Sequence, residues 1–216
     1  EILRHPLVYA IPYFPALNAQ HNAMLKRKKA LLIGAVKDRD WHSYIFIHER
    51  PYRLMALIDV MDEMTDAEYW SALGQAWIDS ENIPQSKTTW GRLLSAFRGD
   101  KHAIMTDDER DELAAMPDEF VIYQGHTSAR DDGWSWTIDA DKAVWFANRF
   151  VNLESHSSPV PIEPMVSTAT IAKSDVLAYF DRRGESEILI NPDRLKSKTT
   201  TDHTKFKRTS SQGASS

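Results

Sequence analysis

The spacing of apolar residues changes once along the chain, near residue 117. Before this point, apolar side chains recur three and four positions apart, which is the spacing of a helix that buries one face. Three segments share it: Leu54, Leu57, Ile58 and Met61; Tyr69, Leu73, Ala76 and Trp77; and Leu93, Leu94 and Phe97. The pattern predicts a helical region over residues 20 to 115.

Two short motifs in this region mark helix starts. Thr65 precedes Glu68 by three residues, and Thr106 precedes Glu109 by the same spacing. In such a pair, each side chain accepts a hydrogen bond from the other residue's backbone N–H. Both motifs therefore predict capping boxes at helix N-termini.

After residue 117, short apolar runs alternate with Gly, Asp and Ser, which is typical of strands joined by turns. We predict strands at 120–123, 166–171 and 188–190, a helix at 140–150 and a loop at 152–164. The expected fold class is α+β, with a helical N-terminal region followed by a compact, largely antiparallel double β-sheet. The expected parts are a mainly helical region at 1–116, a sheet core at 117–195 and a disordered tail at 196–216, where Phe206 is the only large apolar residue.

Length and composition narrow the function classes. A chain of 216 residues can bury one sizeable core, or one main domain with a smaller helical appendage. It has no cysteine, which excludes disulfide frameworks, thiolate catalysis and cysteine-ligated zinc. No histidine falls in an H-E-x-x-H pattern, so no metal site is expected. No apolar run approaches the roughly 18 residues of a membrane span and no secretory signal opens the chain, so we expect a cytoplasmic protein without a membrane partner.

Charge is distributed unevenly around a net value of −5. Basic residues gather toward both ends: Arg4, Lys26, Arg27, Lys28 and Lys29, and later Lys205, Lys207 and Arg208. Such runs are most often solvated surfaces, and nucleic-acid contact is the alternative.

Two carboxylates provide the first candidate chemistry. Glu185 and Glu187 flank one residue just before the apolar run 188–190. In a continuous strand they would lie on one face, roughly 6 to 7 Å apart. Like charges this close are typical either of a site or of a water-screened surface. Ser135 and Thr137 would share a face of another short strand in the same way.

Three motifs in order resemble one family. They are Tyr123-Gln124-Gly125-His126 at a strand end, Ser135-Trp136-Thr137 before an Ala/Phe-rich helix, and Glu185-Ser186-Glu187 before a late strand. Together they resemble the mono-ADP-ribosyltransferase family, whose signatures are an aromatic-Arg-Gly strand, a Ser-x-Thr/Ser strand and a Glu-x-Glu strand. The resemblance covers about residues 119 to 195.

The resemblance implies an enzyme that uses NAD as a substrate and transfers ADP-ribose to a macromolecule, with a protein arginine as the expected acceptor. Glu187 would stabilise the oxocarbenium-like transition state. Glu185 would position or deprotonate the acceptor, and Ser135 would brace Glu187. NAD would be bound by Tyr123, Gln124, Gly125, His126 and Thr137.

The resemblance also assigns roles to neighbouring residues. The segment 179–184 corresponds to the loop that reads the target protein in the family. Aromatic rings could stack on nicotinamide or contact the target; the candidates are Tyr123, Trp134 and Phe180. A role as a toxin or effector would fit the family.

Gln124 departs from the family pattern, which has arginine at this position. A carboxamide can donate hydrogen bonds but has neither the charge nor the bidentate geometry of a guanidinium. His126, Arg130 or Arg149 could supply the missing donor. From sequence alone, replacing Gln124 with arginine is expected to tighten NAD binding.

Three other functions remain open from the sequence. The chain could carry the transferase fold without activity, as a binding module whose recognition lies in the helical N-terminal half. It could also be an NAD hydrolase, or an ADP-ribosyltransferase that modifies nucleic acid. Glu-x-Glu alone would more often be a solvated polar face.

Overall fold

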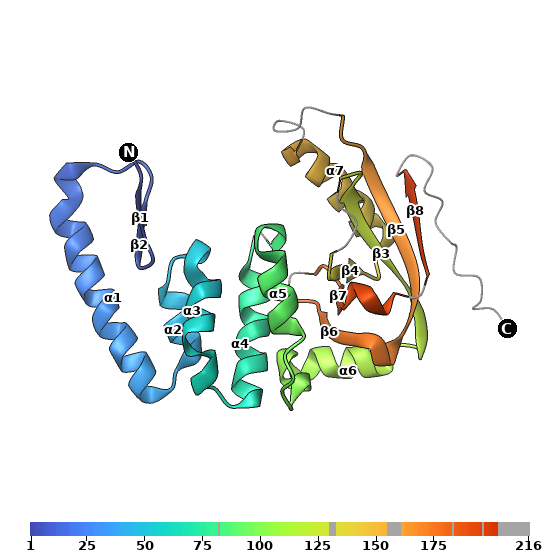
Figure 1. Ribbon diagram of the computed structural model, residues 1–216, viewed down its shortest axis with the longest axis horizontal. Helices are drawn as coiled ribbons and strands as arrows, with labels where there is room; N and C mark the ends of the chain where they lie inside the picture. Colours follow the sequence, from blue (N-terminus) through green and yellow to red (C-terminus); the bar gives the residue numbers. More distant parts are fainter. Residues whose placement is uncertain (82, 130–132, 155–160, 183, 196, 203–216) are drawn as a thin grey trace. The chain divides into compact units, whose positions relative to one another are not determined.

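The computed structural model describes residues 1–81, 83–129, 133–154, 161–182, 184–195 and 197–202 (Figure 1). The chain divides into two compact units, Glu1–Ile104 and Met105–Ser216. The first is mainly helical and the second is built on an antiparallel sheet. This confirms the expected mixture of helix and sheet with a helical N-terminal region.

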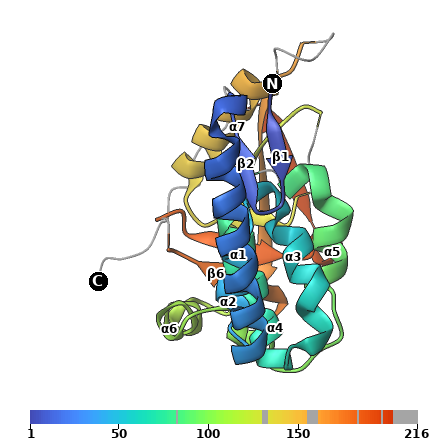
Figure 2. The same ribbon diagram turned by 90° about the vertical axis from the view of Figure 1, so that its left-hand side faces the viewer.

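The first unit contains five α-helices among its described residues, joined by short 3-10 turns. They are α1 (Asn18–Asp38), α2 (Trp41–Ile47), α3 (Arg53–Val60), α4 (Asp66–Asp79) and α5 (Lys87–Leu94). A hairpin of β1 (Leu3–His5) and β2 (Val8–Ala10) lies beside α1 (Figure 2). The sequence did not predict this hairpin, because three-residue strands offer too few alternations to detect.

The core of the first unit forms around α4, as the helical spacing predicted. Tyr69, Trp70, Leu73 and Trp77 are each at most 1% exposed. The Trp77 ring packs edge-on against that of Trp90 in α5, with 5.2 Å between ring centroids. The predicted capping box at Thr65 and Glu68 is present at the start of α4. Local sequence therefore determined both where this helix begins and which face it buries.

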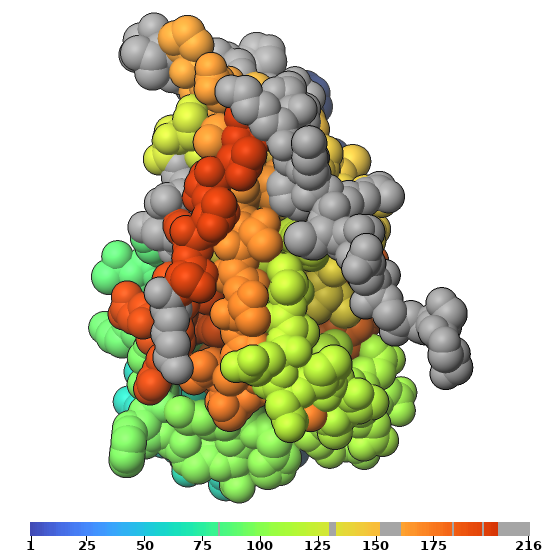
Figure 3. Space-filling model, turned by 90° about the vertical axis from the view of Figure 1, so that its right-hand side faces the viewer, coloured from blue at the N-terminus to red at the C-terminus, as the bar shows by residue number. Residues whose placement is uncertain are grey.

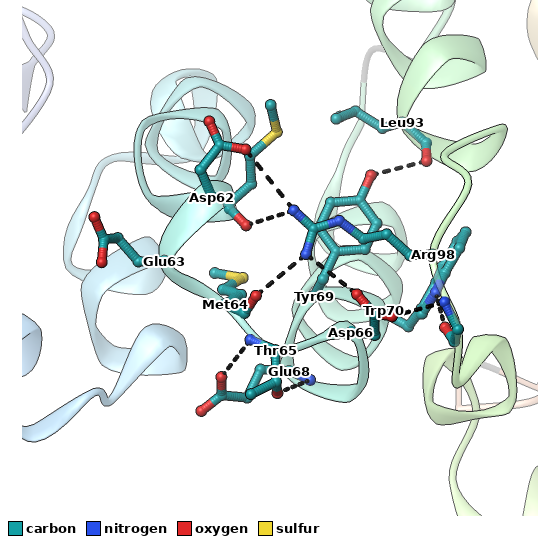
Figure 4. A network of polar contacts seen from close by, with 12 residues as sticks. Asp62, Glu63, Met64, Thr65, Asp66, Glu68, Tyr69, Trp70, Leu93 and Arg98 are labelled. Carbon is teal, nitrogen blue, oxygen red and sulfur yellow. Dashed lines mark hydrogen bonds and ion pairs between the residues drawn. The ribbon is translucent and has the colours of Figure 1, made fainter.

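Arg98 connects three segments of the first unit (Figure 4). Its guanidinium donates to the carbonyl oxygens of Met61, at 2.9 Å, and Met64, at 3.2 Å. These carbonyls follow the end of α3, where backbone carbonyl groups no longer have N–H donors from a following helical turn. The same guanidinium lies over the Tyr69 ring, 4.4 Å from its centroid, and the Tyr69 hydroxyl donates to Leu93 O. One side chain thus holds the α3–α4 connection against α4.

Replacing Arg98 with alanine is expected to lower the free energy of unfolding of the first unit by about 2 kcal/mol, the usual size of a charged hydrogen-bonding contribution. Arg98→Lys should recover part of the loss, because one ammonium cannot serve both carbonyls in the same planar geometry. The measurement is urea unfolding of the full chain followed by tryptophan fluorescence. Arg92→Ala, at an exposed position of α5, is the control, and equal midpoints for Arg98→Ala and wild type would contradict the prediction.

The second unit pairs its described strands in the order β6-β7-β4-β3-β5-β8, and every pairing is antiparallel. The strands are β3 (Glu119–Thr127), β4 (Ser135–Thr137), β5 (Pro164–Ala172), β6 (Val176–Phe180), β7 (Glu187–Ile190) and β8 (Lys198–Asp202). α6 (Asp107–Ala115) precedes them, and α7 (Ala140–Glu154) follows β4. The three strands and the helix predicted after residue 117 are therefore confirmed.

The expected double sheet is found as one continuous sheet with a weak junction. β3 and β4 pair at a single position, Tyr123 opposite Thr137. On one side of this junction, β3, β5 and β8 pair over long ladders, and Figure 3 shows β8, β5 and β3 side by side. On the other side lie β4, β7 and β6. A single connecting pair leaves each three-stranded half free to twist separately.

α6 belongs to the sheet unit, so the units divide earlier in the chain than the change in composition near residue 117. A buried cluster joins both halves of the sheet: Ile122, Trp136, Ala169, Ile171, Tyr179, Ile188 and Ile190. Met105, Leu113 and Met116, which lie in or beside α6, pack against it. The predicted capping box at Thr106 and Glu109 is present and correctly marked the start of α6, but it could not show which core this helix covers.

Several expectations for loops and tail are corrected. Residues 198–202 pair with β5 as an edge strand, although a disordered tail was expected. Threonine favours extended backbone even without large apolar neighbours, and residues 203–216 lie outside the described part. α7 continues to Glu154 and β5 begins at Pro164, so both elements enter the loop expected at 152–164. Residues 155–160 of that loop also lie outside the described residues.

No helix in the described residues has both the length and the apolar character needed to cross a membrane.

Candidate functional site

The three motif-bearing segments are neighbours in the sheet. β4 lies between β7 and β3, so Thr137 is opposite Glu187 on one side and opposite Tyr123 on the other. Directly paired residues of antiparallel strands project to the same face. Tyr123, Thr137 and Glu187 therefore form one row across the sheet. Residues far apart in sequence converge here, as the motif order predicted.

Glu187 is a buried carboxylate, only 6% exposed. It begins β7 and has Phe180 of β6 opposite it on the side away from Thr137. Acidic side chains are seldom this buried unless they are paired or used in chemistry. Among the predicted catalytic residues, it has the environment that best fits a chemical role.

Ser135 does not lie directly opposite Glu187. Its ladder partner is Leu189, so it reaches Glu187 only diagonally, a separation of roughly 7 to 8 Å between backbones in a regular ladder. Ser135 is also exposed. Thr137, expected to contribute to NAD binding, is the nearer ladder neighbour of Glu187.

Glu185 lies outside the strand. β7 begins at Glu187, and Ser186 has a φ of 46°, in the left-handed region. The same-face prediction for Glu185 and Glu187 required extended backbone through Ser186, so it fails here. The backbone of Glu185 is nevertheless held, because Thr137 Oγ1 donates to its carbonyl oxygen at 2.9 Å.

Gln124 is 7% exposed and oriented by β4. Its Nε2 donates to the carbonyl oxygen of Ser135 at 2.9 Å, which assigns the other amide atom as Oε1. Oε1 is buried and has no hydrogen-bond partner among the described residues. The unsatisfied atom is thus an acceptor, which suits a donor group and not a phosphate.

His126 connects three strands. It lies on the same face of β3 as Gln124, by alternation. Nδ1 lies 2.8 Å from Thr127 O, so it carries the proton, and Nε2 lies 2.8 Å from Ser167 Oγ. Ser167 Oγ is in turn 2.8 Å from Thr200 Oγ1 in β8. Both ring nitrogens are therefore used within the fold, and His126 does not replace a phosphate-binding arginine in this arrangement.

Gly125 faces α7. A Cβ atom added there would lie 1.9 Å from the carbonyl oxygen of Ala143 and 2.7 Å from the backbone nitrogen of Ala147. Tyr123, Val166 and these two alanines form the buried contact between helix and sheet. The residue predicted to contact NAD is the one that lets α7 approach β3.

The aromatic candidates for nicotinamide are mostly buried. Phe180 and Tyr179, expected in the target-reading loop, end β6 and are 3% and 4% exposed. Burial raises the pKa of Tyr179 to about 12. Trp136 is 2% exposed and belongs to the core. The loop itself therefore begins at Asp181.

Glu109 and Arg182 form an ion pair that sequence reasoning missed. Arg182 Nε and Nη2 each lie 2.9 Å from a different oxygen of Glu109. Burial raises the pKa of Glu109, but hydrogen bonds from Arg182 and Thr106 lower it more, so its pKa lies below the ordinary 4.5. A pKa lowered by folding means that the pair stabilises the unit at neutral pH and loses this effect as the pH falls through the folded value.

The structure gives less support to nucleic-acid contact by the basic residues near the two chain ends. Lys28 pairs with Glu49 at 2.6 Å, while Lys26, Arg27 and Lys29 are exposed on α1. Residues 205–208 and Arg130 lie outside the described part, and Arg149 lies over the Trp145 ring, 5.0 Å from its centroid. Across the residues that the structure describes, no cluster of three or more potential metal ligands occurs.

The row combines a buried carboxylate with a hydroxyl directly across the ladder. Gln124 and His126 lie on the opposite face of β3 from Tyr123, by alternation, and are not part of this row. A carboxylate in such surroundings can stabilise developing positive charge, because little water screens it. Searches of protein-family models, of curated proteins and of solved structures each found no significant match to the chain.

Proposed function

We propose that the second unit has an ADP-ribosyltransferase-like fold and transfers ADP-ribose from NAD to a macromolecular acceptor, with a protein arginine as the expected target. The observation that supports it most is the row formed by Tyr123, Thr137 and Glu187. One residue from each of the three motifs lies in this row, on three adjacent strands, which is what a site shared by the motifs would need. A chance Glu-x-Glu on a solvated face would not need these neighbours.

In this proposal, Glu187 acts on the ribose. Its carboxylate stabilises the positive charge that develops as the bond from ribose C1′ to the nicotinamide nitrogen breaks, and it accepts a hydrogen bond from a ribose hydroxyl. Thr137 holds the backbone of Glu185 through its hydroxyl and so orients the acceptor side. Glu185 takes a proton as the acceptor nitrogen bonds to C1′, and nicotinamide leaves as a neutral base.

The residues of the candidate site fit the ribose next to nicotinamide better than they fit the pyrophosphate of NAD. The buried Glu187 suits the cationic ribose centre. Gln124 and His126, expected to support the pyrophosphate, already donate to Ser135 and Thr127 within the fold. The unsatisfied Oε1 of Gln124 is buried on the opposite face of β3 from Tyr123, so it lies away from a substrate held at the row.

An inactive binding module is the second candidate, and one observation favours it. Gln124, at the position of the family's arginine, and His126, one candidate to replace it, are both engaged in internal hydrogen bonds. A transferase-like unit with weakened phosphate contacts would bind macromolecules without cleaving NAD. An NAD hydrolase or a transferase that modifies nucleic acid would use the same Glu187 with a different acceptor.

The experiment that tests the proposal is incubation of the full chain with NAD labelled on the adenylate part, together with a cell lysate. Label on protein that is removed by protease supports the proposal, and label removed by nuclease supports the nucleic-acid alternative. Free ADP-ribose without labelled macromolecules indicates a hydrolase. Intact NAD under all conditions would contradict the enzyme and support the binding module.

Gln124→Arg is expected to lower the stability of the second unit by about 2 kcal/mol and not to tighten NAD binding. The structure reverses the expectation from sequence, because the buried amide is held by Ser135 and a charge there would be desolvated. The control is Gln124→Met, which keeps the volume and introduces no charge. It removes the unsatisfied acceptor but also the donor to Ser135 O, so it should lose about 1 kcal/mol and remain more stable than the arginine variant. Thermal unfolding and calorimetric titration with NAD measure both effects. Tighter NAD binding by the stable arginine variant would contradict this prediction.

A further inference from the structure

The segment 181–186 leads into Glu187, and its described residues are 181–182 and 184–186. These residues are held by contacts to α6, by contacts among themselves and by contacts to β4. In the first tie, Glu109 at the start of α6 accepts both hydrogen bonds of the Arg182 fork. The Glu109 side chain is 5% exposed and that of Arg182 30%. A bidentate pair of this kind fixes direction as well as distance. The Asp181 backbone N–H also points to Glu109 Oε1, at 3.4 Å.

The second tie lies within the segment. Asp181 Oδ1 accepts from the backbone N–H of Ser186, at 3.0 Å, and from its hydroxyl, at 3.2 Å. The carbonyl oxygen of Asp181 accepts from the N–H of Gly184, at 2.7 Å. The two ends of the segment are thereby joined, which accommodates the left-handed φ of Ser186.

The third tie connects the segment to β4. Thr137 Oγ1 donates to Glu185 O, and the N–H of Ile138 donates to Ser186 O at 3.3 Å. Glu185 therefore lies between two fixed points, the Glu109–Arg182 pair and the end of β4. Glu187 differs, because it is already held by ladder pairing with Thr137 and Phe180.

We propose that Glu109 is a positioning residue: through its ion pair with Arg182 it holds the described residues of the segment 181–186, Glu185 among them, in one conformation beside Glu187. The consequence for activity rests on the proposed function, whereas the consequence for the segment does not. Arg182 then serves the fold and not an anionic ligand. The pair should govern transfer to the acceptor, while the cleavage of NAD depends on the ladder that holds Glu187.

The variant Glu109→Gln tests the ion pair selectively. Glutamine also suits the third position of a capping box, so the start of α6 is retained while the charge and one acceptor are lost. Asp108→Asn is the matched control, since it removes one charge from an exposed position in the same helical turn. Arg182→Lys tests the other partner, because it keeps the positive charge but loses the bidentate geometry. If Glu109→Gln does not fold, Arg182→Lys provides the test instead.

The first measurement is hydrogen exchange of the full-length protein by mass spectrometry. Peptides covering 181–187 should exchange on the order of tenfold faster in Glu109→Gln than in wild type, a typical effect of removing one charged contact. Arg182→Lys should give an intermediate rate, and Asp108→Asn should match wild type. Peptides from β3 should be unchanged. Wild-type exchange of 181–187 in both pair variants would overturn the proposal whether or not the protein is an enzyme.

The second measurement separates acceptor transfer from NAD hydrolysis. Glu109→Gln should reduce labelling of the acceptor roughly tenfold, since small displacements of a positioning group have effects of this size. Its rate of NAD hydrolysis should remain that of wild type, a split that general destabilisation would not produce. Equal losses of both activities would overturn the positioning role. If wild type cleaves no NAD, the proposed function fails, and the exchange experiment alone decides on the segment.

Discussion

Glu187→Gln is expected to abolish NAD cleavage and transfer, with a loss on the order of 10² to 10³ in rate, the usual cost of removing one group that stabilises transition-state charge. Glutamine keeps the shape of the side chain but not the charge that would face the ribose. The fold should persist, because the ladder pairs of Glu187 use backbone atoms. The measurement is release of nicotinamide from NAD in the presence and absence of acceptor.

Two further variants make this test specific. Glu119→Gln removes a carboxylate from an exposed position of β3 in the same unit, and it should cleave NAD at the wild-type rate. Glu185→Gln should lose transfer while retaining hydrolysis, because Glu185 acts on the acceptor. Similar, small effects of Glu185→Gln and Glu187→Gln would show that neither carboxylate has its assigned role.

Gly125→Ala is expected to lower the free energy of unfolding of the second unit by about 3 kcal/mol, at the upper end of the usual cost of overpacking. The added methyl group would meet backbone atoms of Ala143 and Ala147, which cannot move aside as a flexible side chain can. α7 must therefore shift away from β3. Thermal unfolding of the variant, with circular dichroism as the signal, measures the loss.

Gly34→Ala is the control for this substitution. Gly34 lies within α1, and an added Cβ there would have no neighbour within 4 Å. Alanine should be neutral or stabilise by up to about 1 kcal/mol, because it favours helix more than glycine does. If Gly125→Ala were as stable as Gly34→Ala, the close approach of α7 to β3 would be refuted.

Two different explanations are available for the glycine at position 125, contact with NAD and close packing of α7. Its place after Tyr123 and Gln124 suggested contact with NAD, whereas its surroundings explain the glycine by helix packing alone. Loss of stability in Gly125→Ala is therefore expected without any ligand present. Activity lost in that variant would not by itself identify a substrate contact.

The sequence by itself determined those features that depend on neighbours in the chain. Helical spacing and the boxes at Thr65 and Thr106 located α4 and α6, since both signals involve residues within one or two turns. Alternating apolar runs located β3, β5 and β7 in the same way. The order of the three motifs suggested one site before any strand pairing was known.

Only the tertiary structure decided which residues meet. The register that places Thr137, and not Ser135, opposite Glu187 depends on how separate strands align, and a shift of one residue would turn every side chain to the other face. The positive φ of Ser186 removed Glu185 from the strand, and Glu109 meets Arg182 because α6 packs on the sheet. Such pairings join residues distant in sequence, so their energies depend on burial and geometry that no local pattern contains.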